Sequence, residues 1–188
     1  MVLVCCGVDM DIEHIAVIGS GQMGNGIAQV ASCAGYTVTM VDINQEYLDN
    51  GMNTIIRSLN RLVAKERMSQ QDADNAVSRI TVSTDNNSCA DADLVVEAIP
   101  EIPELKYSTF AELDGICKKS AILASNTSSI SIDSIAGSTN RPDKVIGMHF
   151  MNPVPIMKLV EVINGSETSQ EVTSAVLTVA ERMGKTPL

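Results

Sequence analysis

Apolar residues along the chain follow two alternating patterns. Short apolar runs rich in Val and Ile are separated by longer stretches in which apolar residues recur every three or four positions. The short runs are typical of strands buried on both faces, and the longer stretches are typical of helices that cover a sheet. We expect strands at 15–18, 37–42, 80–83, 94–98, 121–125 and 145–148, and helices at 22–34, 44–65, 69–78, 103–117 and 168–183. This order predicts an α/β fold with a doubly wound, mostly parallel sheet.

A pair of helices is inserted after the second strand. Asn44 is a suitable N-cap for the helix at 44–65, and Ser69 with Asp72 has the spacing of a capping box for the helix at 69–78. A crossover between parallel strands needs only about a dozen residues, so two helices are more than the connection requires. The sequence therefore predicts a helical-pair insertion at this point.

The C-terminal part of the chain departs from the parallel pattern. The segment 158–163 alternates in polarity and follows the connection 153–155, which is too short for a helical crossover. It is therefore expected to run antiparallel to the strand before it. Thr168 and Glu171 have the spacing of a capping box for the last helix, after which the chain enters another strand near Pro187.

A glycine-rich segment joins the first strand to the first helix. Gly19, Gly21 and Gly24 form a GxGxxG motif, which is weak evidence alone but here lies between a buried strand and a helix. Gly19 permits a tight turn, Gly21 leaves room for a pyrophosphate, and Gly24 lets the helix pack close to the strand. The helix begins near Gln22 and Met23, so its free amides and positive dipole end face the phosphates. The segment predicts a dinucleotide site in a Rossmann-type sheet.

Asp42 stands at the end of the second strand, 18 positions beyond Gly24 (42 − 24). A carboxylate there accepts hydrogen bonds from both ribose hydroxyl groups and repels a 2′-phosphate, so the expected cofactor is NAD rather than NADP. The alternative for Asp42 alone is an ordinary turn residue after a strand.

The composition narrows the classes of partner. The chain has 188 residues, of which 45% are hydrophobic and only 3% aromatic, which suits one α/β domain with an aliphatic core. Its formal net charge of −10 argues against nucleic acid or an anionic membrane as a partner. The five cysteines form no CxxC motif and no spacing with histidine that suggests a metal site. We therefore expect reduced thiols, a cytoplasmic location and no bound metal.

The N-terminal leader is not expected to belong to the domain. Residues 1–9 lack the positive start and the length of a signal peptide, and Met10 resembles a second start. No segment approaches the about 20 apolar residues of a membrane span. We expect residues 1–10 to lie outside the fold and residues 11–188 to form one nucleotide-binding domain.

His149 and Glu161 are the strongest candidates for catalysis. A histidine takes and returns a proton near neutral pH, and His149 is one of only two in the chain. Taken singly, His149 would be a hydrogen-bonded histidine at a strand end, and Glu161 a solvated carboxylate. If the connection 153–155 folds their strands together, Glu161 orients the imidazole and stabilises its protonated form. With a hydride acceptor nearby, the pair predicts oxidation of an alcohol or reduction of a ketone.

Two further polar segments are candidates for binding. Asn126 to Ser129 follow the fifth strand and offer uncharged groups to a nicotinamide ribose or a substrate oxygen, but such a run is equally typical of a turn that caps a short helix. Arg57, Arg61 and Lys65 lie at helical spacing and form a basic stripe. This stripe is either a solvated helix face or a site for the phosphates of a coenzyme A group.

Several segments carry a family resemblance beyond the glycine motif. They are 19–28, Asp42, 95–101, 125–129 and 149–161. Together they resemble the 3-hydroxyacyl-CoA dehydrogenase family, and in particular its bacterial 3-hydroxybutyryl-CoA members. The stretch from His149 to Glu161 is the most specific part, and the match runs from about Ile12 to the last residue.

The resemblance implies roles for single residues. His149 matches the catalytic base and Glu161 its carboxylate partner, while Ser128 and Asn152 match groups that hydrogen-bond near the substrate oxygen and the nicotinamide. Three further positions match residues that line the cofactor site: Glu101, Lys106 and Asn126. The helical pair with the basic stripe matches the part of the family that approaches coenzyme A. The implied reaction is NAD-dependent oxidation of L-3-hydroxyacyl-CoA to 3-ketoacyl-CoA, or the reverse.

The resemblance covers only the N-terminal domain of the family. Family members continue for roughly another hundred residues into a helical domain that completes the acyl pocket and forms a homodimer interface. A fragment, a truncated gene and a split subunit are all compatible with this pattern. Two other functions remain open: a stand-alone NAD-binding module without turnover, and a dehydrogenase of a free hydroxy acid, which leaves the segment 149–153 unexplained.

Overall fold

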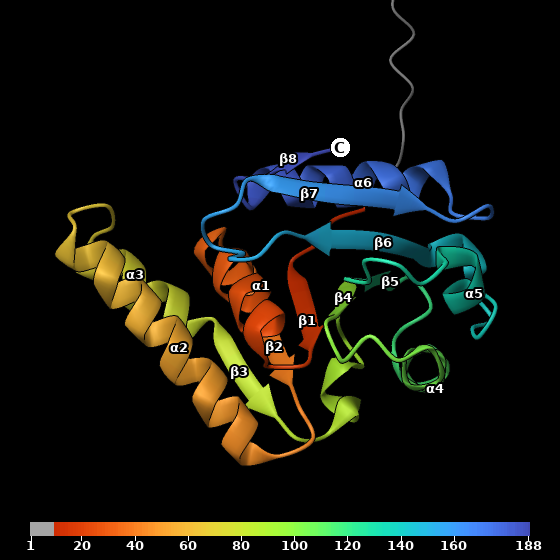
Figure 1. The fold of residues 1–188 in the computed structure, drawn as a ribbon, viewed down its shortest axis with the longest axis horizontal. Coiled ribbons are helices and arrows are strands. Elements are labelled where there is room, and N and C mark those ends of the chain that lie inside the picture. The colour runs from red at the N-terminus through yellow and green to blue at the C-terminus, as the bar shows by residue number, and fades with distance from the viewer. Residues whose placement is uncertain (1–9) are drawn as a thin grey trace, which may run out of the picture.

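An eight-stranded sheet forms the centre of the computed structural model, which describes residues 10–188 (Figure 1). The strand order is β3-β2-β1-β4-β5-β6-β7-β8. The first six strands are parallel, β7 is antiparallel to β6, and β8 is parallel to β7. The bounds are β1 His14–Ile18, β2 Thr37–Val41, β3 Ile80–Ser83, β4 Leu94–Glu97, β5 Ile122–Ser125, β6 Val145–Phe150, β7 Leu159–Asn164 and β8 Thr186–Pro187. The predicted Rossmann-type sheet with antiparallel C-terminal strands is confirmed.

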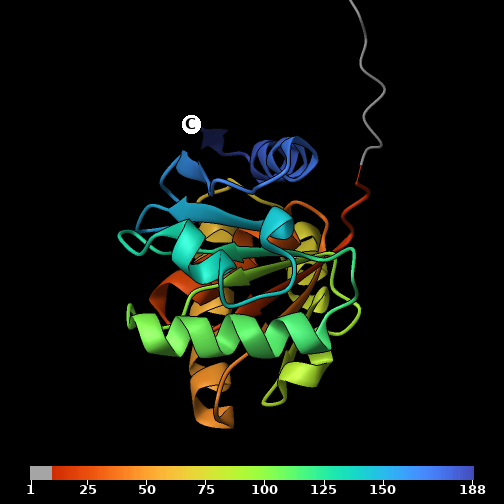
Figure 2. The same ribbon diagram turned by 90° about the vertical axis from the view of Figure 1, so that its right-hand side faces the viewer.

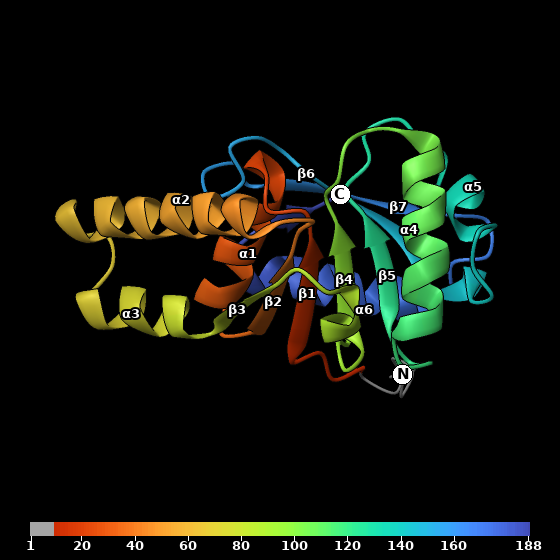
Figure 3. The same ribbon diagram turned by 90° about the horizontal axis from the view of Figure 1, so that it is seen from below.

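Helices cover both faces of the sheet. The bounds are α1 Gln22–Cys33, α2 Gln45–Ala64, α3 Gln70–Ser78, α4 Pro103–Ile116, α5 Ile132–Ala136 and α6 Gln170–Arg182, with 3-10 helices at Asn86–Cys89 and Pro142–Lys144. Figure 2 shows α4 and α6 on opposite sides of the sheet. The pair α2 and α3 lies side by side and projects from one end of the sheet (Figure 3), as expected for the helical-pair insertion. Within residues 10–188, no helix has both the length and the apolar character needed to cross a membrane.

Each face of the sheet has its own apolar core. In β1, Ile15 and Val17 pack into the core that includes α1 and α6, whereas Ala16 and Ile18 pack into the core that includes α4 and α5. Burial of a Val or Ile side chain stabilises a fold by about 1.5–3 kcal/mol, so a strand that is covered on both sides gains from apolar residues at every position. This explains why the strands read as continuous apolar runs.

The predicted helix caps are confirmed at two of three positions. Asn44 Oδ1 accepts a hydrogen bond from the amide of Tyr47, and Ser69 Oγ accepts one from the amide of Asp72. The prediction for the last helix is wrong, because Ser169 and not Thr168 is its N-cap. The Thr168 hydroxyl instead accepts a hydrogen bond from the Gly165 amide and donates one to the carbonyl of Val145. A tertiary contact with β6 therefore outweighs the local capping pattern.

The leader prediction lies almost entirely outside the described residues. Residues 1–9 are not part of the described structure, and the predicted boundary after residue 10 stays a prediction. The short helix α5 after the fifth strand was expected only as the alternative in which the polar run at 126–129 is a turn that caps a short helix. Its five residues are too few for an apolar period to stand out from the surrounding turn.

Candidate active site

The glycine motif forms a tight strand–turn–helix with open space at its centre. Gly19 has φ of +97°, which side-chain-bearing residues rarely adopt. A Cβ on Gly24 would lie only 1.7 Å from the carbonyl oxygen of Gly19, so α1 packs directly against the turn. A Cβ on Gly21 would meet no protein atom within 4 Å. The three glycines therefore have the distinct roles that a dinucleotide cradle needs: turn, close packing and free space for a pyrophosphate.

Asp42 follows β2 and is held in place by neighbouring donors. Its Oδ2 accepts hydrogen bonds of 2.7 Å from both the amide and the hydroxyl group of Ser20, and its Oδ1 accepts one of 2.7 Å from the Ile43 amide. The turn after β1 and the end of β2 are thus tied together at the carboxyl edge of the sheet. The sequence reasoning did not identify Ser20, which lies inside the glycine motif but is not one of its glycines.

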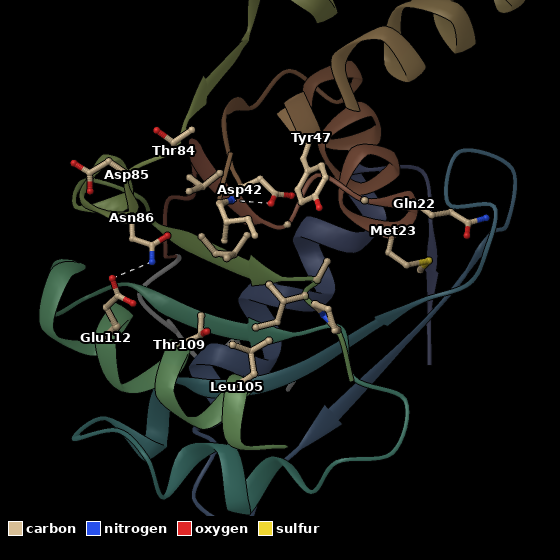
Figure 4. Close-up of a pocket in the computed structure, with 18 residues that line it drawn as sticks. Gln22, Met23, Asp42, Tyr47, Thr84, Asp85, Asn86, Leu105, Thr109 and Glu112 are labelled. Atoms are coloured by element: carbon tan, nitrogen blue, oxygen red, sulfur yellow. Dashed lines mark hydrogen bonds between the residues drawn. The ribbon is translucent and has the colours of Figure 1, made fainter. Parts of the chain in front are cut away.

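A cleft of about 800 Å³ opens at this edge, where the strand order reverses between β1 and β4. Figure 4 shows Asp42 and Tyr47 facing Leu105, Thr109 and Glu112 of α4 across it. Five residues predicted from the sequence line the cleft: Gly19, Gly21, Gln22, Met23 and Asp42. Ligands of open α/β sheets bind at such a reversal, so the position, the volume and the free space at Gly21 fit an extended nucleotide.

Buried Lys106 and partly exposed Glu101 belong to a polar network that also contacts the loop carrying Ser128. The Lys106 ammonium group is 1% exposed and lies 2.6 Å from Glu97 Oε1 and 3.3 Å from Glu101 Oε2. Glu101 Oε1 accepts hydrogen bonds from the Thr127 hydroxyl (2.5 Å) and the Ser128 amide (2.9 Å). Burial alone would raise the pKa of Glu101, but these donors and Lys106 outweigh it and lower the pKa from 4.5 to about 2.

The contacts of Glu101 and Lys106 bear on their predicted role in binding the cofactor. Direct contact of Glu101 and Lys106 with a cofactor stays a prediction, because neither residue lines the 800 Å³ cleft and Lys106 is engaged by carboxylates. Ser128 Oγ lies 3.4 Å from Glu101 Oε1, so its position is set by the same carboxylate. The buried Glu97 was not predicted as a site residue. Glu97 lies in β4 and Lys106 in α4, so no helix or strand period relates the two residues. Only the fold shows that they form an ion pair.

His149 and Glu161 lie directly opposite each other in the antiparallel pair β6–β7. The distance between His149 Nδ1 and Glu161 Oε2 is 2.7 Å, and the side chains are 20% and 43% exposed. Within residues 10–188, the other ring nitrogen of His149, Nε2, forms no hydrogen bond. Asn126 Oδ1 accepts a hydrogen bond of 2.8 Å from the Phe150 amide, which ties the turn after β5 to the end of β6. The expected strand reversal therefore brings the two candidates into contact.

A groove of about 410 Å³ adjoins this end of the site. Arg57 and Arg61 of α2 lie on one side, and the connection from β6 to β7 lies on the other. Asn152 Oδ1 accepts a hydrogen bond of 3.2 Å from Gln22 Nε2 of α1, and both residues line the groove. Lys65, the third residue of the predicted basic stripe, is the C-cap of α2 and does not line the groove. The structure thus brings two of the three basic residues to the candidate catalytic residue Asn152.

Comparison with known proteins agrees with this arrangement. The family profile for the 3-hydroxyacyl-CoA dehydrogenase, NAD binding domain, matches residues 14–188. The chain belongs to this family. A protein of Bacillus subtilis named probable 3-hydroxybutyryl-CoA dehydrogenase is 48% identical, with 94% of the chain and 62% of the relative covered. A protein of Deinococcus radiodurans with the same name is 50% identical, with 92% of the chain and 62% of the relative covered.

Solved structures of the 3-hydroxyacyl-CoA dehydrogenase family share the fold. The (S)-3-hydroxybutyryl-CoA dehydrogenase of Ralstonia eutropha aligns with a TM-score of 0.93 at 43% identity, with 95% of the chain and 63% of that structure covered. The 3-hydroxybutyryl-CoA dehydrogenase of Escherichia coli also has a TM-score of 0.93, at 40% identity, with 95% of the chain and 38% of that structure covered. The chain spans 62% of the length of its two curated relatives named above.

NAD is the cofactor of this domain family, and the residues present fit it. The open space at Gly21 suits a pyrophosphate, and the carboxylate of Asp42 beside the cleft suits ribose hydroxyl groups. The orientation of Asp42 depends on Ser20, and that of the Ser128 loop depends on Thr127 and Glu97. Ser20, Thr127 and Glu97 lie in segments that the sequence singles out, but no role was assigned to them, because their contacts with other elements follow from the fold.

Proposed function

We propose that residues 11–188 form the NAD-binding and catalytic-base domain of a 3-hydroxyacyl-CoA dehydrogenase that interconverts L-3-hydroxyacyl-CoA and 3-ketoacyl-CoA. The observation that carries this proposal is the contact of 2.7 Å between His149 and Glu161 at the same edge of the sheet as the nucleotide cleft. The names of the relatives favour 3-hydroxybutyryl-CoA as the substrate. The reaction, the substrate and a cytoplasmic location are all part of the proposal.

His149 acts as the general base of this reaction. Its Nε2 accepts the proton of the substrate hydroxyl group, while Glu161 at Nδ1 orients the ring and stabilises the imidazolium that forms. Ser128 and Asn152 donate hydrogen bonds near the substrate oxygen, and in the reverse direction His149 returns its proton to that oxygen. Bound NAD supplies the hydride acceptor. Arg57 and Arg61 hold phosphate groups of coenzyme A along the groove.

The proposal includes a helical partner domain that completes the acyl pocket and forms a homodimer. The chain spans less than two thirds of its curated relatives, so the test includes the chain alone and the chain mixed with a helical domain from a relative. The exposed groove and the 20% exposed His149 are consistent with a site that a second domain closes.

The experiment compares reduction of acetoacetyl-CoA by NADH in the native chain, His149→Ala, Glu161→Gln and His14→Gln. His14 is the matched control, because it is the other histidine and contacts Thr39 away from the cleft. We expect His149→Ala to lower the rate by about 10²–10⁴-fold and Glu161→Gln by a smaller factor, with NADH affinity retained in both. His14→Gln should keep the native rate.

Three outcomes contradict the proposal. NADH binding without turnover in any combination, or a rate that His149→Ala leaves unchanged, indicates a nucleotide-binding module. Faster turnover of free 3-hydroxybutyrate than of its thioester indicates a hydroxy acid dehydrogenase, and in that case Arg57→Ala should not change KM.

A further inference from the structure

Lys185 is a buried cation that the proposed reaction does not use. It follows α6 and is 8% exposed. Its ammonium group donates hydrogen bonds to the backbone carbonyls of Val154 and Met157, the second at 2.8 Å. Within residues 10–188, it forms no ion pair with a carboxylate. Burial, with a smaller effect of Lys158, lowers the pKa of Lys185. A buried charge without an opposite charge is costly, so the two carbonyls are its essential partners.

The connection that Lys185 holds has few other anchors. Between β6 and β7 the amides of Ile156 and Met157 both donate to the carbonyl of Pro153, at 3.0 and 2.9 Å, which makes a tight turn. Ile156 is 71% exposed, so apolar burial contributes little at the tip of the turn. Val154 is buried against α1, where a Cβ on Gly26 would lie 2.8 Å from Val154 Cβ. Lys185 and this α1 contact fix the turn from two sides.

The same turn forms one wall of the groove beside the candidate active site. Residues 153–156 face Arg57 and Arg61 across the groove. The turn follows Asn152 directly, and Asn152 contacts Gln22 at the start of α1. A shift of the turn therefore changes the width of the groove and the position of Asn152 together, whereas no residue of the turn lines the nucleotide cleft around Gly21 and Asp42.

We propose that Lys185 is a positioning residue for the acyl-CoA groove: by holding the carbonyls of Val154 and Met157, it sets the wall opposite Arg57 and Arg61. The inference rests on the proposed function, since it assigns the groove to the thioester substrate. Lys185 itself lines neither the nucleotide cleft nor the groove. Its loss should weaken binding of the thioester and leave binding of NADH unchanged.

The first experiment measures amide hydrogen exchange in the native chain, Lys185→Met, Lys185→Gln and Lys158→Met. Lys158→Met is the matched control, because Lys158 lies at the end of the same connection but its exposed ammonium group only contacts the Gly184 carbonyl at 3.3 Å. Exchange at the amides of Ile156 and Met157 should rise about tenfold in Lys185→Met and remain native in the control. Lys185→Gln keeps an amide donor, so it provides a milder variant if Lys185→Met fails to fold.

The second experiment measures the Kd of acetoacetyl-CoA and of NADH for the same variants. Lys185→Met should weaken acetoacetyl-CoA about tenfold and Lys185→Gln about threefold, with NADH within twofold of the native value. Equal weakening of both ligands, or native affinity for acetoacetyl-CoA in both variants, overturns the inference. A chain that binds NADH but no acetoacetyl-CoA, both alone and mixed with the helical domain of a relative, shows instead that the proposed function is wrong, and the inference fails with it.

Discussion

At the scale of single residues, the carboxylates of the site are oriented largely by neutral donors. Asp42 accepts hydrogen bonds from Ser20 and from the Ile43 amide, and no ion pair involves Asp42 within residues 10–188. Glu101 accepts hydrogen bonds from Thr127 and Ser128 in addition to its contact with a lysine. Backbone amides and short hydroxyl side chains are rigid, so they hold a charge in one position. The donors therefore hold both carboxylates in fixed orientations before any ligand binds, although the chain as a whole carries a net charge of −10.

The charge of Asp42 should determine which dinucleotide binds. Asp42→Asn keeps an acceptor oxygen for Ser20 but removes the charge that repels a 2′-phosphate. We expect the ratio of NADH to NADPH affinity to fall about tenfold, measured by fluorescence titration with both cofactors. Asp49→Asn, an exposed carboxylate on α2, should leave the ratio unchanged. An unchanged ratio in Asp42→Asn would show that the carboxylate does not face the ribose.

Glu101 should make the fold sensitive to acid. Its pKa is lowered from 4.5 to about 2, so the ionised form stabilises the native state above pH 4.5, and this stabilisation is lost as the pH falls toward 2. Glu101→Gln should therefore be less stable than the native chain at pH 7, with a difference that shrinks toward zero between pH 4.5 and 2. Urea unfolding at several pH values measures this. A difference that does not depend on pH would argue against the lowered pKa.

At the scale of elements, β1, the glycine turn and α1 act as one unit. The turn is tight because α1 packs onto it at Gly24, and it leaves space because Gly21 has no protein atom nearby. Glycine thus allows close packing of the helix at position 24 and leaves space for a ligand at position 21. Gly115, near the end of α4, neither packs against a neighbouring backbone nor lines the nucleotide cleft.

Substitution of these glycines by alanine separates packing from binding. Gly24→Ala should destabilise the fold by about 1–3 kcal/mol or more, because its Cβ overlaps the Gly19 carbonyl. Gly21→Ala should lower stability by no more than about 1 kcal/mol, because Gly21 is the N-cap of α1 and alanine is a poorer cap. It should weaken NADH at least tenfold, since its Cβ enters the space assigned to the pyrophosphate. Gly115→Ala, the control, should raise stability by about 0.5–1 kcal/mol. Urea unfolding and NADH titration measure both effects, and native NADH affinity in Gly21→Ala would exclude the proposed phosphate position.

At the scale of the whole molecule, one sheet joins two apolar cores. Ile122 and Leu123 are neighbours in β5, but Ile122 packs into the core with α1 and α6, and Leu123 into the core with α4 and α5. Both residues are fully buried. Because the strands are shared, loss of packing on one face weakens the layer that supports the other. The domain should therefore unfold as one cooperative unit.

Truncation on either face tests this cooperativity. Ile122→Ala and Leu123→Ala should each lower the free energy of unfolding by about 2–5 kcal/mol, through lost burial and a residual cavity. The midpoint of urea unfolding should shift, and the slope should stay the same in both variants. Lys119→Ala, an exposed residue of the preceding turn, is the control. A second transition or a smaller slope in only one variant would indicate that the two layers unfold separately.

Much of the fold and part of the site could be predicted from the sequence. Strand and helix periods, the glycine motif and the N-caps Asn44 and Ser69 all depend on residues within a few positions of one another. The contact of His149 with Glu161 could be predicted from the sequence, because a connection too short for a helix forces the strands to reverse. Thr168 shows the limit, since its hydroxyl group contacts the distant strand β6 in preference to the local cap.

The sequence by itself determined the order of strands and helices, the dinucleotide motif and the catalytic candidates, because those features follow from local backbone preferences and short spacings. Only the tertiary structure decided which distant groups support them. It paired Glu97 with Lys106, placed Arg57 and Arg61 but not Lys65 on the groove, and brought Lys185 to the Val154 carbonyl. Such contacts join different elements of the fold, and their energy depends on burial and geometry that no local pattern encodes.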